Sequence, residues 1–333
     1  MGRNKTIRTT VEEGRAYLEH CVTEELIQSA CKEKEAKEPG AADVSIRNAT
    51  VWGDMLRICP LLKKQSVNLL IADPPYNRRK TYGNRIFEAQ KWDDYLEYTR
   101  KWVSAVSPLL APDASIYVCC DWESSAVIQK VLSEHFTVRN RITWQRAKGR
   151  GAKNNWKNDM EDIWFATVGN SYYFDLESVK VRRRVLAPYR ENGEPKDWEN
   201  AENGNFRLTC PSNFWDDLTV PFWSMAENTA HPAQKPEKLL AKLIIASSCE
   251  GDLVFDPFLG SGTTSVTAKK LGRDYLGIER EARYCVFAEQ RLEMAESDPS
   301  IQGYEDGVFW ERNSRTSGGS GRKSFGKSDR RKK

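Results

Sequence analysis

Residues 253–279 read LVFDPFLGSGTTSVTAKKLGRDYLGIE, and this stretch decides the fold. A short apolar strand at 253–255 leads into a loop with glycines at 260 and 262, a helix follows, and a second strand ends at Glu279. Glycines at a strand-to-helix turn let the backbone approach a ligand closely, and an acid at the end of the next strand is where a Rossmann-like fold binds a ribose diol. The stretch therefore predicts half of a nucleoside-binding α/β fold.

The residues around the two glycines exclude the common phosphate-binding loops. Thr263 and Thr264 follow Gly262 without the lysine that a P-loop needs, and Ser265 stands at the third glycine position of the dinucleotide fingerprint. We therefore expect a nucleoside cofactor without phosphates, a description that fits S-adenosylmethionine. A purely structural turn is the alternative, and Glu279 argues against it.

The alternation of strands and helices continues on both sides of this stretch. Apolar runs predict further strands at 49–52, 67–72, 115–120, 163–168 and 275–278. Helical spacing or composition predicts helices at 10–36, 93–110, 124–136, 236–248, 263–271 and 281–294. This order predicts an α/β fold with a Rossmann-like, doubly wound and mostly parallel sheet.

A second motif, Asp73-Pro74-Pro75-Tyr76, follows the apolar run 67–72. Ligands of open α/β sheets bind outside the carboxyl ends of the strands, so the motif is placed for chemistry. An aromatic exocyclic amine is a poor nucleophile because its lone pair is delocalised into the ring. The Asp73 carboxylate and the Pro74 carbonyl can accept its two N–H groups while the lone pair turns towards a methyl donor.

The other two residues of this motif support the same interpretation. Two successive prolines fix the backbone and remove two donors, while Tyr76 offers a flat face on which a base can stack. We expect all four residues, Asp73 to Tyr76, to be catalytic. The alternative is a strand that ends at prolines with a surface tyrosine, and the neighbouring cofactor loop argues against it.

The two motifs together resemble the β class of DNA amino-methyltransferases, in which Asp-Pro-Pro-Tyr precedes the cofactor loop. The resemblance covers most of residues 48–292. It implies a class I methyltransferase fold and the transfer of a methyl group to the N6 amine of adenine in a short duplex sequence, after base flipping. Cytosine-N4 methyltransferases are the nearest alternative, but they usually carry serine in place of Asp73. RNA and protein amino-methyltransferases are a more distant alternative, but they often carry Asn-Pro-Pro-Tyr after the cofactor loop, whereas here the motif precedes it.

The resemblance also implies roles for single residues. Asp54 would contact the cofactor's adenine, Lys235 in the segment 231–236 would face its methionine end, and the strand block 158–166 would line the base pocket. The expected cofactor-binding residues are Asp54, Asp73, Lys235, Asp256, Phe258, Gly260, Ser261, Gly262, Thr263 and Glu279. Ala233 stands where relatives usually carry threonine.

A basic run at 146–157 is the candidate DNA-binding segment. It has five positive charges and no acid, and its glycines and asparagines predict a flexible loop that contacts backbone phosphates. The charged residues are Arg146, Lys148, Arg150, Lys153 and Lys157. Three successive arginines at 182–184 add a second cluster. A solvated loop with no partner is the alternative.

Composition and the family resemblance together divide the chain into five segments, and the resemblance implies the region of target recognition. We expect an N-terminal helical extension at 1–45, a catalytic half at 46–169, a target-recognition region at 170–230, a cofactor-binding half at 231–298 and a basic disordered tail at 299–333. The last 20 residues hold eight Lys or Arg and one Asp, with too few apolar residues to fold. This tail is either a non-specific DNA-binding arm or a solvated end.

The bulk composition excludes several other classes of protein. No run approaches the roughly 20 apolar residues of a membrane span, and the polar N-terminus is not a secretory signal. The eight cysteines are scattered and the three histidines are not clustered, so we expect no metal site. We expect a cytoplasmic, prokaryotic-type enzyme acting on double-stranded DNA. The resemblance allows a homodimer and a cognate restriction endonuclease.

Overall fold

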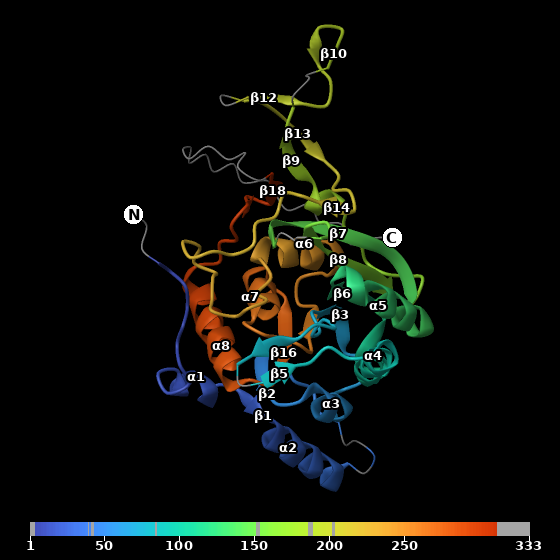
Figure 1. Ribbon diagram of the computed structural model, residues 1–333, viewed down its shortest axis with the longest axis vertical. Helices are drawn as coiled ribbons and strands as arrows, with labels where there is room; N and C mark the ends of the chain where they lie inside the picture. The colour runs from blue at the N-terminus through green and yellow to red at the C-terminus, as the bar shows by residue number, and fades with distance from the viewer. Residues whose placement is uncertain are drawn as a thin grey trace.

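The computed structural model describes residues 4–38, 40, 43–83, 85–150, 154–185, 189–201 and 204–311, and its centre is a nine-stranded sheet (Figure 1). In spatial order the strands are β1 (Val22–Thr23), β2 (Ala49–Trp52), β16 (Asp274–Glu279), β15 (Leu253–Asp256), β3 (Val67–Ala72), β6 (Leu110–Cys120), β8 (Asn158–Thr167), β7 (Thr137–Arg150) and β14 (Phe214–Trp215). β8 runs antiparallel to both of its neighbours, and the other neighbouring pairs are parallel. The expected doubly wound, mostly parallel α/β fold is confirmed.

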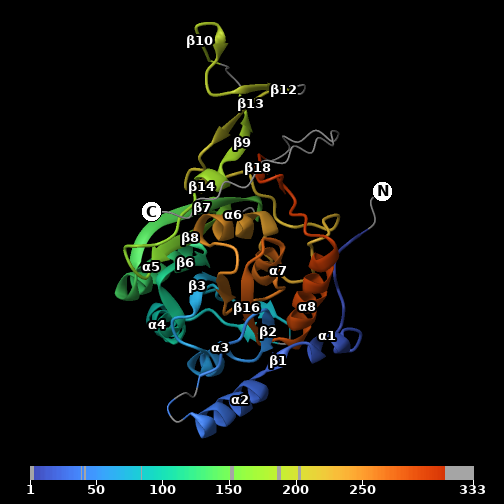
Figure 2. The ribbon, with the colours of Figure 1, turned by 180° about the vertical axis from the view of Figure 1, so that it is seen from behind.

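Alternate residues of β3 pack on opposite faces of this sheet, as the pleat of a strand requires. Leu70 and Ala72 belong to one apolar cluster, and Leu69 and Ile71 belong to the other. The first cluster is covered by α3 (Met55–Ile58), α4 (Trp92–Val106) and α5 (Trp122–His135), and the second by α6 (Glu237–Ser247), α7 (Thr263–Lys270) and α8 (Ala282–Ser297). Figures 1 and 2 show these helices on the two sides of the sheet.

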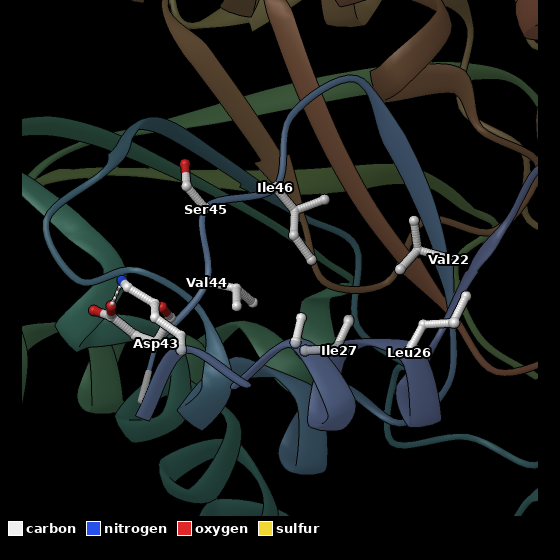
Figure 3. A pocket seen from close by; sticks show the side chains of 9 residues that line it. Val22, Leu26, Ile27, Asp43, Val44, Ser45 and Ile46 are labelled. Carbon is white, nitrogen blue, oxygen red and sulfur yellow. Dashed lines mark hydrogen bonds and ion pairs between the residues drawn. The ribbon is translucent and has the colours of Figure 1, made fainter. Parts of the chain in front are cut away.

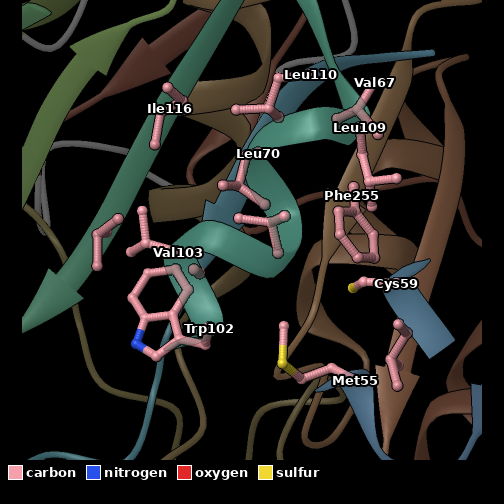
Figure 4. Packing of buried hydrophobic residues seen from close by; sticks show 14 of the residues in the cluster. Met55, Cys59, Val67, Leu70, Trp102, Val103, Leu109, Leu110, Ile116 and Phe255 are labelled. Atoms are coloured by element: carbon pink, nitrogen blue, oxygen red, sulfur yellow. The ribbon is translucent and has the colours of Figure 1, made fainter. Parts of the chain in front are cut away.

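The first cluster helps to explain why β3 is apolar without interruption from Leu69 to Ala72. Trp102 and Val103 of α4 pack beside Leu70, and the ring of Phe255 from β15 lies in the same cluster (Figure 4). All four side chains are at most 1% exposed. A strand that is buried on both faces has no polar side to present, so its sequence does not alternate.

Two predicted elements differ from the structure. The single helix expected at 10–36 is wrong, because α1 (Arg15–Glu19) and α2 (Glu24–Lys37) are separated by β1, which pairs with β2 at the sheet edge. Thr23 ends that strand and caps α2 by accepting a hydrogen bond from the Leu26 amide. β7 was not predicted as a strand, since its polar and basic residues conceal the pairing with β8.

The region 170–230 forms most of a second, smaller sheet. Its strand β13 (Gly204–Thr209) runs antiparallel to both β12 (Glu199–Ala201) and β9 (Val181–Arg184). β18 (Val308–Trp310) and β17 (Tyr304–Glu305) complete the order β12-β13-β9-β18-β17. The expectation of a disordered tail from residue 299 is therefore wrong for 299–311. The basic residues from 315 onwards lie outside the described residues.

The remaining short strands form two separate hairpins. β10 (Arg190–Glu191) and β11 (Glu194–Pro195) form a hairpin at the far end of the smaller sheet, and β4 (Lys80–Tyr82) and β5 (Arg85–Phe87) form another after the Asp-Pro-Pro-Tyr motif (Figure 1). Three short 3₁₀ turns occupy Cys59–Leu61, Ser107–Leu109 and Glu177–Val179.

A buried charge cluster joins the smaller sheet to α6. Asp217, which follows β14, lies 2.8 Å from Lys242 and 2.9 Å from Lys238. Lys238 also donates to the Trp310 carbonyl at the end of β18. These lysines are at most 8% exposed, so the cluster fixes the C-terminal strand, the inserted region and α6 relative to one another.

Replacing Phe309 by alanine tests whether β18 is part of the folded protein. Phe309 is 0% exposed and packs with Val179, Val181 and residues of α6, so its removal should cost about 3–5 kcal/mol of unfolding free energy. Denaturant unfolding measures this loss. Leu208→Ala, on the exposed face of β13, is the control and should change stability by less than about 0.5 kcal/mol. Equal stability of the two variants would contradict the packing of β18.

Candidate active site

The predicted site residues leave the carboxyl ends of four neighbouring strands. β2 ends just before Asp54, β16 ends at Glu279, β15 ends at Asp256 and β3 ends just before Asp73. These strands are adjacent and parallel in the order β2-β16-β15-β3. All four loops therefore meet at one edge of the sheet, where ligands of such folds bind.

Two glycines shape the cofactor loop, which we define as residues 257–262. Gly260 and Gly262 have φ angles of +56° and +81°, in the left-handed region that glycine adopts without strain. A Cβ atom on Gly262 would lie 2.7 Å from Ala288 of α8, and one on Gly260 would lie 3.1 Å from the ring of His231. The loop thus lies directly against α8 and His231, and a larger residue does not fit at 262.

Two carboxylates flank this loop, of which Asp256 is buried and Glu279 is partly buried. Asp256 accepts hydrogen bonds from the Phe258 amide at 2.9 Å and the Thr264 hydroxyl at 2.6 Å. Glu279 accepts hydrogen bonds from the Gly260 amide and from the Glu281 amide, both at 2.8 Å. Burial raises the pKa of Asp256 and of Glu279 to about 7. Buried acids beside a glycine loop favour a cationic or hydroxyl-bearing ligand and disfavour phosphate.

Ser261 and Thr263 accept hydrogen bonds that fix the cofactor loop to α8. The Ser261 carbonyl and the Thr263 hydroxyl accept hydrogen bonds from Arg291 of α8 at 2.8 and 2.9 Å. Arg291 is itself 2.9 Å from Glu237 at the start of α6. Any contact of these two loop residues with a cofactor remains a prediction.

The other two predicted contacts lie on either side of the loop. The Phe258 ring meets Trp102 edge to face at 5.5 Å. Asp54 caps α3 by accepting from the Leu56 amide at 3.0 Å, and its carboxylate lies 3.4 Å from Arg280. Both residues are at the correct edge of the sheet, and their roles towards the cofactor also remain predictions.

The Asp-Pro-Pro-Tyr motif forms a compact polar cluster with two residues from elsewhere in the chain. Lys235 lies 2.6 Å from Asp73 and 3.3 Å from Glu161 of β8. The Tyr76 hydroxyl lies 2.9 Å from Asp73, 3.2 Å from Glu161 and 3.1 Å from the Lys235 ammonium. Burial alone would lower the pKa of Lys235, but Asp73 and Glu161 raise it above its ordinary value. Lys235 is therefore a permanent cation beside Asp73.

Tyr76 is held more tightly than its predicted stacking role requires. The Lys235 ammonium lies 5.3 Å from the centre of its ring and 3.1 Å from its hydroxyl oxygen, so it is at the hydroxyl edge of the ring. The Pro75 carbonyl accepts from the Tyr95 hydroxyl at 3.0 Å, and the Asn77 amide donates to the Ser124 hydroxyl at 3.1 Å. These bonds fix the motif on α4 and α5.

His231 positions the segment that carries Lys235. Its ring packs edge-on against Tyr284 of α8 with centroids 4.4 Å apart, directly beneath Gly260. Burial lowers the pKa of His231 to about 3, so the ring is neutral and acts as a packing group. The segment 231–236 is thereby fixed between the cofactor loop and the catalytic cluster.

The structure separates the residues of the basic run. Arg146 lies at the start of the run and pairs with Glu161 at 2.6 Å, whereas Lys157 is exposed. The side chains of Lys148 and Arg150, and all of Lys153, lie outside the described residues. The expectation of a loop is wrong for 146–150, because β7 extends to Arg150.

Sequence analysis did not single out Glu161. It lies in the block 158–166 that the resemblance assigned to the base pocket, but no role was given to this residue. Glu161 directly precedes the predicted strand that begins at 163, with only Asp162 between them. This position could have indicated a paired carboxylate, because carboxylates are rarely buried unless paired.

One surface hollow lies away from this edge of the sheet. A hollow of about 390 Å³ lies on the N-terminal extension between α2 and residues 43–46, and it contains none of the predicted site residues (Figure 3). Among the described residues, no group of three or more His, Cys, Asp or Glu side chains could hold a metal ion. In the same part of the chain, no helix is long and apolar enough to cross a membrane.

The sheet order and the two motifs at its carboxyl edge define a class I methyltransferase. The chain belongs to the N6/N4 DNA methylase family, whose sequence model matches residues 67–290.

Relatives extend over most of the chain. It is 32% identical to the type II methyltransferase M.HpaI of Haemophilus parainfluenzae over 235 residues, which are 70% of each protein. It is 32% identical to the DNA adenine methyltransferase YhdJ of Escherichia coli K12 over 252 residues, 74% of this chain and 82% of that one. The solved PvuII cytosine-N4-specific DNA methyltransferase shares the fold, with a TM-score of 0.54 at 18% identity over 77% of this chain and 93% of that chain.

Alanine at Gly262 tests the close approach of the cofactor loop to α8. Left-handed backbone costs a non-glycine residue about 1–2 kcal/mol, and the clash with Ala288 should add about 1–3 kcal/mol. Gly251→Ala is the matched control, because Gly251 has a φ of +82° but nothing within 4 Å of the added atom. Denaturant unfolding should show the larger loss for Gly262→Ala, and equal losses would rule out the clash.

Proposed function

We propose that this protein transfers a methyl group from S-adenosylmethionine to the N6 amine of adenine in a short duplex DNA sequence. The observation that carries the proposal is the position of Asp73 at the end of β3, next to β15 and its cofactor loop, with Lys235 at 2.6 Å. Family membership and the name of the relative YhdJ, a DNA adenine methyltransferase, support the choice of DNA and of adenine.

The residues at the cofactor loop fit S-adenosylmethionine by their chemistry. Glu279 keeps unused lone pairs on both oxygens after accepting two amide hydrogens, so it can also accept the ribose hydroxyls. Asp256 and Glu279 supply negative charge near a cationic ligand, and the glycines leave space for it. When bound, the cofactor would supply an electrophilic methyl group on a sulfonium sulfur.

The chain's own contribution to transfer is to hold the amine. Asp73 would accept one N–H of the target amine, and the Pro74 carbonyl would accept the other. Both acceptors localise the nitrogen lone pair in the direction of the cofactor loop, and the fixed loop supplies proximity without reorganisation. The extra proton on nitrogen after transfer lies next to the Asp73 carboxylate, which is the nearest acceptor.

Double-stranded DNA as substrate requires a base to leave the helix, because its amine is paired inside the stack. We assign target recognition to the smaller sheet and its connections. Its strand β9 carries Arg182, Arg183 and Arg184, and exposed Lys157 adds charge for backbone phosphates. Because M.HpaI is named as a type II methyltransferase, we extend the proposal to a cognate restriction endonuclease, and the resemblance adds a homodimer.

Mass spectrometry of nucleosides from DNA treated with the protein and cofactor tests the proposal. N6-methyladenine as the main product is the expected result. N4-methylcytosine as the main product would overturn the choice of base and leave the chemistry standing. Methyl transfer to RNA or protein but not to DNA would overturn the function.

Replacing Asp73 by alanine tests the amine acceptor. Methyl transfer should fall by at least about 100-fold, the scale of losing one preorganised stabilising group, while cofactor affinity is largely retained. Methylation assays and calorimetry measure the two effects. Asp113→Ala, an exposed position on β6, should behave as the wild type. Turnover close to normal in Asp73→Ala would remove Asp73 from the mechanism.

The raised pKa of Glu279 predicts a pH dependence of cofactor binding. A carboxyl group with a pKa of about 7 is mostly protonated at lower pH and ionised at higher pH. Since the ionised form binds the cation and its hydroxyls better, affinity should rise with pH by up to about tenfold per unit below the pKa. Glu279→Gln should weaken binding by about 1.5–3 kcal/mol and flatten this rise. Calorimetry across the pH range decides, and an unchanged pH profile in the variant would exclude Glu279 as its source.

A further inference from the structure

Four charged side chains of alternating sign connect the basic run to the catalytic motif. Arg146 lies 2.6 Å from Glu161, Glu161 lies 3.3 Å from Lys235, and Lys235 lies 2.6 Å from Asp73. The four residues come from β7, β8, the segment before α6 and the end of β3. The chain of contacts therefore links segments that are distant in sequence.

Glu161 holds the same two groups that hold Asp73. One of its oxygens accepts from the Tyr76 hydroxyl at 3.2 Å and lies 3.3 Å from the Lys235 ammonium. Both of these groups also donate to Asp73, at 2.9 and 2.6 Å. Without Glu161, both donors can turn fully to Asp73 and occupy lone pairs that the target amine needs, since a carboxylate has only about four such positions.

Arg146 completes the balance of charge. It lies two residues from Trp144, which is directly opposite Glu161 in the β7–β8 register, so Arg146 and Glu161 share one face of the sheet. The Glu161 side chain is 8% exposed and the Arg146 side chain is 39% exposed. Each of the two acids thus has a cationic partner, which matters because unpaired buried charge is strongly unfavourable, and Lys80 of β4 is a further cation that interacts with all four side chains.

We propose that Glu161 is a positioning residue for methyl transfer, and that Arg146 acts on the catalytic centre through Glu161 rather than on the DNA backbone. The proposal rests on the proposed function, because it concerns the acceptor role of Asp73. It assigns Arg146 a role different from that of Lys157, the exposed cation at the other end of the same basic run.

Glu161→Gln removes the charge and keeps the size of the side chain. We expect kcat to fall roughly 10–100-fold, the effect of a small misplacement of reacting groups, with cofactor KM and DNA affinity within about twofold of the wild type. Glu161→Asp keeps the charge and should recover part of the loss. Glu33→Gln, exposed on α2, is the matched control and should keep the wild-type kcat. Wild-type kcat in Glu161→Gln would overturn the proposal.

Arg146→Gln and Lys157→Gln separate a positioning role from a phosphate contact. Arg146→Gln should lower kcat and leave the salt dependence of DNA binding unchanged. Lys157→Gln should reduce the slope of log affinity against log salt by about one, as the loss of one phosphate contact predicts. A reduced slope with wild-type kcat in Arg146→Gln would make it a DNA contact and overturn the proposal. Arg146 is partly exposed, so this arm decides the matter if Glu161→Gln does not fold.

Wild type and Asp73→Ala measured in parallel separate this proposal from the proposed function. If the wild type methylates DNA and Asp73→Ala does not, the function stands and the Glu161 and Arg146 variants test the positioning role alone. If the wild type does not methylate DNA, the proposed function fails and the positioning role fails with it.

Discussion

The ion pair between Lys235 and Asp73 is the contact on which the geometry of the site depends. It joins residues that are 162 positions apart and belong to the two halves of the core. The side chains of Lys235 and Asp73 are 9% and 21% exposed, so the loss of either partner would leave a poorly solvated charge. The pair can form because β3 lies beside β15 and because His231 packs beneath the cofactor loop. Sheet order and loop packing thus determine where a methyl group can be transferred.

The carboxylates at the sheet edge have two different environments. Asp73 and Glu161 are paired with a lysine and an arginine. Asp256 and Glu279 instead accept hydrogen bonds from amides and a hydroxyl, and burial raises their pKa to about 7. The first pair has basic side chains as partners. The second pair gains most from a cationic ligand, which would stabilise its ionised form.

The sequence predicted the elements whose pattern is local. The apolar runs of β3 and β15 and the glycine turn at 260–262 fix their own conformation, and the strand ends then bring Asp73, Asp256 and Glu279 to one edge. Lys235 was predicted through the family resemblance. Its contact with Asp73 was not predicted, because a side-chain contact across 162 residues leaves no local pattern.

The errors have a common physical origin in tertiary pairing. The strand β7 is stabilised by β8, and its exposed basic residues carry no apolar alternation that would show the pairing. β18 is three residues long and forms only because β9 offers a parallel edge and α6 offers an apolar surface. The DNA contact expected of Arg146 remains a prediction, but its pairing with Glu161 across β7 and β8 likewise leaves no local pattern in the sequence.

The helix α6 connects the catalytic cluster rigidly to the smaller sheet. It begins two residues after Lys235, and it carries Lys238 and Lys242 to Asp217 and to the end of β18. Movement of the base of the smaller sheet relative to Lys235 would separate these buried ion pairs, which is strongly unfavourable. The hairpin of β10 and β11 is not part of this five-stranded sheet and makes none of these buried contacts. If the smaller sheet recognises the target sequence as proposed, its base would therefore keep a constant position relative to Lys235 and Asp73.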